Sequence, residues 1–185
     1  MEEIINKCKE KDISAQSTLY EKYSEKVYRT AYLLTRSKTL AEDVTQETFI
    51  RLFSKITLYD EDKLFDSWLY TITLNVARSI LKRQKWLNLF GPLWEYEIYS
   101  NKDSLELNYE RKERDRLIKE VIDRLPYKLR EVIILKYYIN FSQEEIASIL
   151  NIPIGTVKSR IHTSLEKVRK VMDNNISIRE VFSHE

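Results

Sequence analysis

The stretch SQEEIASILNIPIGTVKSRIHTSLEKVRKVM, residues 142–172, predicts two helices joined by a tight turn. Ser142 and Glu145 have the spacing of a capping box, in which each side chain accepts a hydrogen bond from the other residue's backbone amide. Asn151 and Pro153 then end the first helix. Pro153 suits the first position of the second helix because its missing amide would have no partner there. This arrangement is typical of a helix-turn-helix.

The second helix of this stretch has an apolar stripe and a basic face. The residues predicted to be buried recur at steps of three and four: Ile154, Val157, Ile161, Leu165, Val168 and Met172. The helix carries five basic residues and one acidic residue, a net charge of +4. Such a helix fits the major groove of DNA. The alternative is an amphipathic hairpin with a solvated basic face, but the coincidence of capping box, turn and charge favours DNA contact.

Composition limits the remaining classes of protein. Two glycines and three prolines in 185 residues favour an almost wholly helical protein with short connections. The net charge of +2 is too small for a general polyanion binder, so DNA contact should depend on local charge. Cys8 is the single cysteine, and no zinc-ligand spacing exists, so we expect no disulfide, metal or cofactor. The polar N-terminus and the short uncharged run 67–77 predict a cytoplasmic chain without a membrane span.

Two amphipathic helices are expected in the N-terminal part. The first, over residues 14–36, has its apolar stripe at Leu19, Tyr23, Val27, Ala31 and Leu34. Thr39 and Glu42 predict a capping box at the start of the second. This second helix should bury Val44, Phe49 and Leu52 and expose Asp43, Gln46, Glu47 and Ile50. An isoleucine among acidic and amide side chains suggests a partner surface, although a solvated face with one stray isoleucine is the alternative.

A longer helix is predicted from Phe65 towards Lys85, after a loop over residues 57–63. Its core stripe is Phe65, Leu69, Ile72, Val76 and Ile80, and its flank is Trp68, Thr71, Asn75, Arg78 and Lys82. An aromatic ring beside cations suits unstacked bases and their phosphates. For Trp68 taken singly, packing in the core is the favoured alternative.

The composition changes over residues 86–112, which we interpret as a linker. Gly91 and Pro92 interrupt an aromatic stretch whose Trp86, Phe90 and Trp94 are too apolar for a free tether, so they should dock on a domain or a partner. A helix is expected from about Arg114, followed by one with Leu129, Val132, Ile133 and Tyr137 as its apolar side. The predicted domains are therefore 1–85 and 113–176, with a tail over 177–185.

Three segments, in this order, together resemble the group 4, extracytoplasmic-function (ECF) sigma factors of bacterial RNA polymerase. AEDVTQETFIRLF (41–53) resembles the polymerase-binding helix of sigma region 2. FDSWLYTITLNVARSILKR (65–83) is similar to the helices that melt and read the −10 element. LPYKLREVIILKYYINFSQEEIASILNIPIGTVKSRIHTSLEKVR (125–169) resembles region 4, which reads the −35 element.

The resemblance implies an all-α, two-domain, non-enzymatic promoter-specificity factor and assigns residues to three surfaces. The surface facing the polymerase clamp helices comprises Asp43, Gln46, Glu47 and Ile50. The −10 set, with Asn75 in the pocket for a flipped base, comprises Tyr59, Phe65, Trp68, Asn75, Arg78, Lys82 and Arg83. The −35 set, with Arg160 as a phosphate contact, comprises Thr156, Lys158, Ser159, Arg160, His162, Thr163 and Lys167. Two positions depart from the family pattern: Ser79 replaces the usual Asp, and Ile152 replaces a polar cap.

The expected partners are core RNA polymerase, promoter DNA and an anti-sigma protein, with no small-molecule substrate and no direct membrane insertion. A conventional dimeric helix-turn-helix regulator is the main alternative. It would need a ligand or dimerisation domain within residues 1–90, which the pattern there does not suggest. A metal-dependent hydrolase using Glu42, Asp43 and Glu47 is disfavoured because these carboxylates have no histidine partner.

Overall fold

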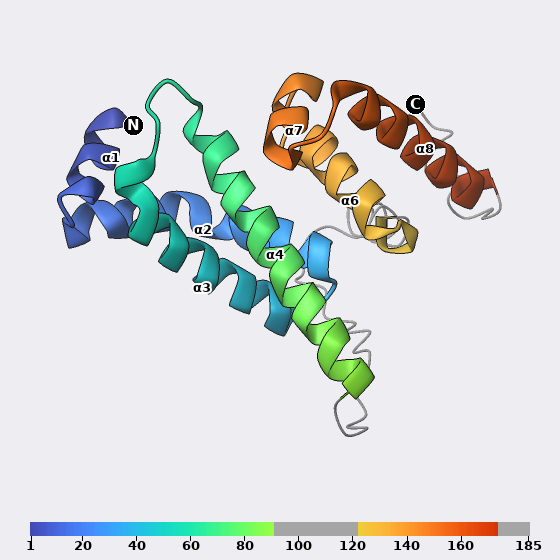
Figure 1. Ribbon diagram of the computed structural model, residues 1–185, viewed down its shortest axis with the longest axis horizontal. Coiled ribbons are helices and arrows are strands. Elements are labelled where there is room, and N and C mark those ends of the chain that lie inside the picture. Colours follow the sequence, from blue (N-terminus) through green and yellow to red (C-terminus); the bar gives the residue numbers. More distant parts are fainter. Residues whose placement is uncertain (91–121, 174–185) are drawn as a thin grey trace, which may run out of the picture. The chain divides into compact units, whose positions relative to one another are not determined.

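The computed structural model describes residues 1–90 and 122–173, with side chains described for 1–86 and 122–170. The chain divides into two compact units, Met1–Tyr96 (unit 1) and Glu97–Glu185 (unit 2). The described residues of both units form helices and no strands (Figure 1), which confirms the all-α prediction. Within these residues, no helix is both long and apolar enough to cross a bilayer.

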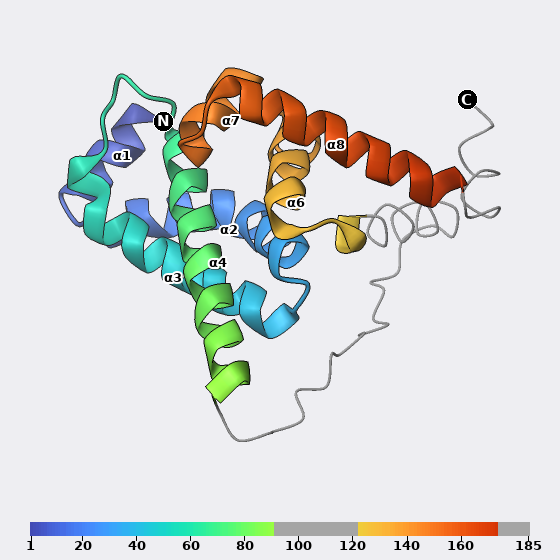
Figure 2. The ribbon, with the colours of Figure 1, turned by 45° about the vertical axis from the view of Figure 1, so that its right-hand side comes forward.

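The described residues of unit 1, 1–90, form four α-helices and a short 3₁₀ turn. They are α1 (Glu2–Lys9), α2 (Ile13–Thr35), α3 (Lys38–Lys55), the 3₁₀ turn η1 (Ile56–Leu58) and α4 (Phe65–Phe90). α4 packs against both α2 and α3, as Figure 2 shows for its crossing of α3. It continues to Phe90, past the predicted boundary at residue 85, so the first residues of the expected linker are helical.

The predicted apolar stripes of α2 and α3 form the core of unit 1. All five stripe residues of α2 are buried, and Val44, Phe49 and Leu52 of α3 are buried with them. α4 is buried over a wider face than predicted. Ile72 and Ile80 are only partly buried, whereas Tyr70, Thr73, Leu74 and Ala77 are fully enclosed. The reason is that α4 contacts two helices instead of one.

The predicted cap of α3 is wrong by two residues. The helix begins at Lys38, and the Ser37 hydroxyl accepts a hydrogen bond from the Leu40 amide at 3.3 Å. Thr39 therefore lies in the first turn, exposed to solvent. Ser37 takes the cap because Arg36 ends α2 in the left-handed region, at φ 62°, which leaves only Ser37 between the two helices. The third helical residue is Leu40, which has no side-chain acceptor, so no capping box forms.

The described part of unit 2 is a helical segment, α6 continued by η2, followed by the predicted helix-turn-helix. Its elements are α6 (Tyr127–Ile133), the π-helical turn η2 (Ile134–Tyr138), α7 (Gln143–Leu150) and α8 (Ile154–Asp173). The capping box of α7 is confirmed: the Glu145 amide donates to the Ser142 hydroxyl at 3.1 Å, and the Ser142 amide donates to the Glu145 carboxylate at 2.7 Å. Asn151 adopts a left-handed conformation, φ 51°, and turns the chain towards α8.

The buried face of α8 is displaced from the predicted stripe. Ile154 and Leu165 are 37% and 44% exposed, whereas Ser164 is fully buried between Ile161 and Val168. Pro153 precedes the first helical residue instead of occupying it, and its carbonyl accepts the Thr156 and Val157 amides. The displacement arises because α8 packs against both α6 and α7. Tyr137 was expected on the apolar side of the helix before the helix-turn-helix, but it is 55% exposed.

Several expectations fall outside the described residues. They concern the break at Gly91 and Pro92, Trp94, the helix from Arg114 and the tail over 177–185. The side chains of Phe90 and Met172 are outside the description too. Trp86 lies on α4 and is 61% exposed.

Candidate partner and nucleic-acid interfaces

One face of α3 carries the predicted partner surface. This surface, the α3 arc, consists of Asp43, Gln46, Glu47 and Ile50, and its isoleucine is 63% exposed. The Glu47 carboxylate accepts from the Arg51 Nε at 2.6 Å, within one turn of the helix. The arc therefore combines one apolar side chain, two acidic groups and an amide on one exposed surface. The predicted separation of this arc from the buried Val44 and Phe49 is confirmed.

The α3 arc borders a depression of about 340 Å³ between α3 and α4. Its other wall is formed by Ser79, Ile80 and Arg83 of α4. Arg83, which was predicted to join the −10 set, thus lies beside the α3 arc. The sequence analysis missed Ser79 and Ile80 as neighbours of the arc, although their spacing with Arg83 is that of one helical face.

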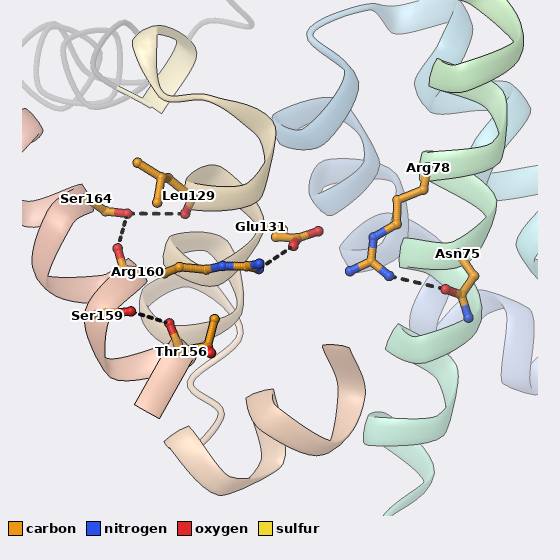
Figure 3. Close-up of polar contacts among 8 residues, drawn as sticks. All are labelled: Asn75, Arg78, Leu129, Glu131, Thr156, Ser159, Arg160 and Ser164. Carbon is orange, nitrogen blue, oxygen red and sulfur yellow. Dashed lines mark hydrogen bonds and ion pairs between the residues drawn. The ribbon is translucent and has the colours of Figure 1, made fainter. Parts of the chain in front are cut away.

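Asn75, Arg78 and Lys82 lie on one flank of α4, which we call the α4 flank. Asn75 and Lys82 are exposed, and Arg78 is partly exposed. Figure 3 shows that the Arg78 Nη1 donates to the Asn75 Oδ1, at 3.3 Å. A guanidinium only donates hydrogen bonds, so it fixes the carbonyl oxygen of Asn75 on its side. The amide NH₂ of Asn75 is then the group offered to a ligand.

Three aromatic residues of the predicted −10 set pack against one another. Tyr59 and Phe65 are 8% and 6% exposed, with ring centroids 5.5 Å apart, and Trp68 packs beside them with its centroid 5.1 Å from that of Tyr59. The Tyr59 hydroxyl donates to the Lys63 carbonyl, and burial raises the pKa of this phenol. In this structure Tyr59 and Phe65 are core side chains, and their assignment to the −10 set stays a prediction. Trp68 is partly buried and packs against this core, as the favoured alternative for this residue predicted.

The turn between η1 and α4 is held by several polar contacts. The Lys63 ammonium lies 3.2 Å from the Asp60 carboxylate, and the Asp62 amide donates to that carboxylate at 3.2 Å. These bonds hold the pKa of Asp60 below its usual value. Lys9 of α1 pairs with Glu61. The turn is thereby fixed by local contacts and by the N-terminal helix.

α8 presents a row of polar side chains, the α8 row, to solvent. Lys158, Ser159, His162 and Lys167 are exposed, whereas Thr156 and Thr163 are partly buried. The Ser159 hydroxyl donates to the Thr156 carbonyl at 3.0 Å. A Cβ added at Gly155 would have no atom within 4 Å, so the start of the row is open. The row can offer both donors and cations to a groove.

Arg160 differs from the rest of the predicted −35 set. Its Nη1 lies 3.2 Å from the Glu131 carboxylate of α6, and the two side chains are 20% and 3% exposed (Figure 3). One turn later, the Ser164 hydroxyl lies 2.6 Å from the Arg160 carbonyl and 3.4 Å from the Leu129 carbonyl. Glu131 was missed by the sequence analysis. The one available signal was an acidic residue directly before the apolar run Val132–Leu135.

Within residues 1–90 and 122–173, no group of three or more His, Cys, Asp or Glu side chains could hold a metal ion.

Comparisons with known proteins agree with this arrangement. A model of Sigma-70 region 2 matches residues 19–87, and a model of Sigma-70, region 4 matches residues 115–168. The chain is 32% identical over 179 residues to the ECF RNA polymerase sigma factor SigW of Bacillus subtilis (strain 168), covering 90% of this chain and 93% of SigW. It is 30% identical over 189 residues to the ECF RNA polymerase sigma-E factor of Escherichia coli (strain K12), covering 94% and 92% of the two chains.

Solved structures show the same fold. RpoE of Bartonella quintana, solved in complex with the anti-sigma factor NepR, has a TM-score of 0.65 at 25% identity, covering 85% of this chain and 96% of RpoE. CnrH, solved in complex with the cytosolic domain of CnrY, has a TM-score of 0.68 at 20% identity, covering 93% and 96% of the two chains.

Two helical units, one of them a helix-turn-helix with an exposed basic row, define a DNA-binding transcription factor. The chain belongs to the ECF RNA polymerase sigma factors, and it is a promoter-recognition sigma factor. Sigma factors are not enzymes. The dimeric regulator is not favoured, because Sigma-70 region 2 occupies residues 19–87, where that alternative needs a ligand or dimerisation domain.

Proposed function

We propose that the two units divide promoter recognition between them. Unit 1 binds core RNA polymerase through the α3 arc and engages the opened −10 strand through the α4 flank. Unit 2 reads the duplex −35 element through the α8 row. The observation that carries this proposal is the α8 row itself, exposed on the second helix of a helix-turn-helix. A helix presented in this way enters the major groove with its N-terminal residues against base edges.

The α3 arc is the surface proposed to face the clamp helices of the large catalytic subunit. Ile50 supplies apolar area that water otherwise covers, and Asp43 and Glu47 supply charge that fixes orientation. The depression shared with Ser79, Ile80 and Arg83 extends this surface onto α4. Because Arg83 lies there, we assign it to polymerase contact in place of −10 contact.

The α4 flank is proposed to capture an unstacked base of the melted −10 strand. Extruding a base costs a few kcal/mol, which hydrogen bonds to its edge and phosphate contacts can offset. Asn75 provides the edge contact through its NH₂ group, since Arg78 holds its carbonyl oxygen. Lys82 lies one helical turn after Arg78 on α4, where it can neutralise a phosphate.

The chain is proposed to be a group 4 factor, without catalytic activity of its own, that acts in the cytoplasm. Melting then follows from binding energy and from contacts made by the polymerase. We propose that an anti-sigma protein restrains it. This partner is supported by RpoE and CnrH, which were solved with an anti-sigma factor and with the cytosolic domain of CnrY, respectively.

The −35 assignment is tested by transcription with purified core polymerase on promoter libraries randomised at the −35 element. Lys158→Ala should weaken transcription and relax sequence preference, because this side chain is placed to reach base edges. Lys167→Ala serves as the matched comparison, since it removes a cation of the same exposed helix. It should weaken binding uniformly and reduce the salt slope by about 1. Parental transcription by both variants on every −35 sequence would exclude α8 as the reader.

A further inference from the structure

Unit 2 buries a carboxylate directly beneath its recognition helix. Glu131 of α6 is 2% exposed and follows the buried Arg130. The described ion-pair partner of Glu131 is Arg160 of α8, 29 residues later, at 3.2 Å. A helix that meets polyanionic DNA is thus supported on a buried negative charge, which by itself would repel phosphates.

Stability alone does not account for this pair. Removing two charges from water costs several kcal/mol per ion, and well-packed apolar residues of similar volume are often equally or more stabilising. Apart from the buried Arg130, the neighbours of the pair in sequence are apolar: Val132, Ile133 and Ile161 are buried beside it. An apolar pair at positions 131 and 160 would therefore be compatible with this core, so the charges call for a functional reason.

Contacts at two successive turns of α8 hold Arg160 towards the interior of unit 2. Its Nη1 is committed to Glu131, and its side chain is only 20% exposed. One turn later, Ser164 is fully buried, with its hydroxyl near the Leu129 and Arg160 carbonyls. If Arg160 swung out to a phosphate, Glu131 would be left buried and without this cation, which is strongly unfavourable.

We propose that Glu131 withholds the charge of Arg160 from the DNA phosphates and so lowers the sequence-independent part of the affinity for DNA. This inference rests on the proposed role of α8 as the −35 reader. Phosphate contacts add affinity that does not depend on sequence, whereas base contacts carry the specificity. By cancelling one cation of α8, Glu131 reduces the affinity for promoter and non-promoter DNA alike, together with its salt dependence.

The proposal is tested by salt titrations of DNA binding by the reconstituted holoenzyme. The probes are a promoter fragment selected by the parental holoenzyme from a random library, and the same fragment with its −35 element scrambled. Kd is measured between about 50 and 200 mM KCl, where each phosphate contact adds about 0.9 to the slope of log Kd against log salt. The variants are Glu131→Gln, the double variant Glu131→Gln with Arg160→Gln, and Lys167→Gln.

The three variants have distinct expected results. Lys167→Gln should make the slope shallower by about 0.9, because a phosphate-neutralising cation is lost. The double variant should keep the parental slope, since it removes a pair that contributes no net charge to DNA. Glu131→Gln alone should make the slope steeper by about 0.9. It should tighten binding to the selected and the scrambled fragment by a similar factor, so the ratio of their affinities should stay parental.

Each deviating outcome has a defined meaning. A double variant whose slope becomes as shallow as that of Lys167→Gln would show that Arg160 contacts a phosphate, which overturns the proposal. A parental slope for Lys167→Gln would count against the proposed function, on which this inference rests. If Glu131→Gln alone does not fold by circular dichroism, the double variant decides the question, because it removes both members of the ion pair.

Discussion

The two units of this sigma factor use charge in different ways. In unit 1, ion pairs such as Glu3–Lys7, Glu25–Arg29 and Glu47–Arg51 join exposed side chains one turn apart on the same helix. In unit 2, Arg130 and Glu131 lie inside the core, and Glu131 links α6 to the recognition helix.

Because of this difference, exposed charges of unit 1 can be substituted without loss of the fold, whereas the buried charges of unit 2 cannot. An exposed pair within one helix contributes about 0.3–0.5 kcal/mol, so unit 1 can alter its charges for a partner without losing its fold. A buried pair that loses one member costs about 3–5 kcal/mol. In unit 2, a change in charge at this position therefore affects both folding and DNA binding.

The largest expected effect in this comparison is on stability. Arg160→Met should destabilise unit 2 by about 3–5 kcal/mol, because the buried Glu131 carboxylate would lose its ion pair with Arg160. Urea unfolding of the full chain, followed by circular dichroism, measures the loss. Arg29→Met is the matched control in unit 1, where its partner Glu25 is 74% exposed, and it should cost less than about 0.5 kcal/mol. Equal losses of unfolding free energy in the two variants would show that the buried pair of unit 2 matters no more for stability than an exposed pair of unit 1.

A charge reversal on the α3 arc should change binding while leaving stability almost unaltered. Glu47→Lys should abolish co-purification with core polymerase, since like charges placed together at an interface cost several kcal/mol. Its melting temperature should change little, because the lost contact with Arg51 is a solvent-exposed helical pair.

Glu3→Lys is the control for this reversal. Glu3 also pairs with a cation one turn away, Lys7, but it lies on α1, outside the α3 arc. This variant should co-purify with polymerase like the parent. If Glu47→Lys retains parental affinity, the α3 arc is not the polymerase surface.

The α4 flank tests base capture in unit 1. Asn75→Ala should alter the preferred −10 base or slow strand opening, since the hydrogen bond from the Asn75 NH₂ group to the base edge is worth about 0.5–1.5 kcal/mol. Asn75→Asp should do more damage. It removes the NH₂ donors, adds a charge that repels the strand, and pairs with Arg78.

Permanganate footprinting and transcription on a −10 single-base library provide the readout, with holoenzyme formation confirmed in parallel. Asn6→Ala is the matched control, because Asn6 is another exposed helical asparagine, on α1. Parental base preference and parental opening in both Asn75 variants would mean that this residue does not line a base pocket.

Local patterns made much of the fold predictable. The capping box at Ser142 and the stripe of α2 depend on residues within a few positions of each other, and both are confirmed. The exposure of the α3 arc was equally predictable from the sequence, because Ile50 falls on a polar helix face. These features need only helix periodicity and local hydrogen bonds.

The errors come from packing between distant segments. A helical pattern gives a stripe but not its centre, so Leu165 was expected to be buried where Ser164 is. The enclosure of Tyr59 and Phe65 by contacts among α2, η1 and α4 was not predicted either. Arg160 pairs across 29 positions, a distance at which sequence patterns carry no information about ion pairs. The roles of the site residues themselves remain predictions.

The smallest effect concerns the start of α3 and decides between the sequence-based cap and the observed one. Ser37→Ala should destabilise unit 1 by about 1 kcal/mol, because the Leu40 amide loses its hydroxyl acceptor. Thr39→Ala should be neutral or slightly stabilising, since Thr39 is exposed within the first turn and alanine has the higher helix propensity. Urea unfolding of the two variants gives the comparison. A larger loss of stability for Thr39→Ala than for Ser37→Ala would show that Thr39, and not Ser37, caps α3. α3 would then begin later, and the α3 arc would lie nearer the first turn of the helix, where the helix dipole favours its carboxylates.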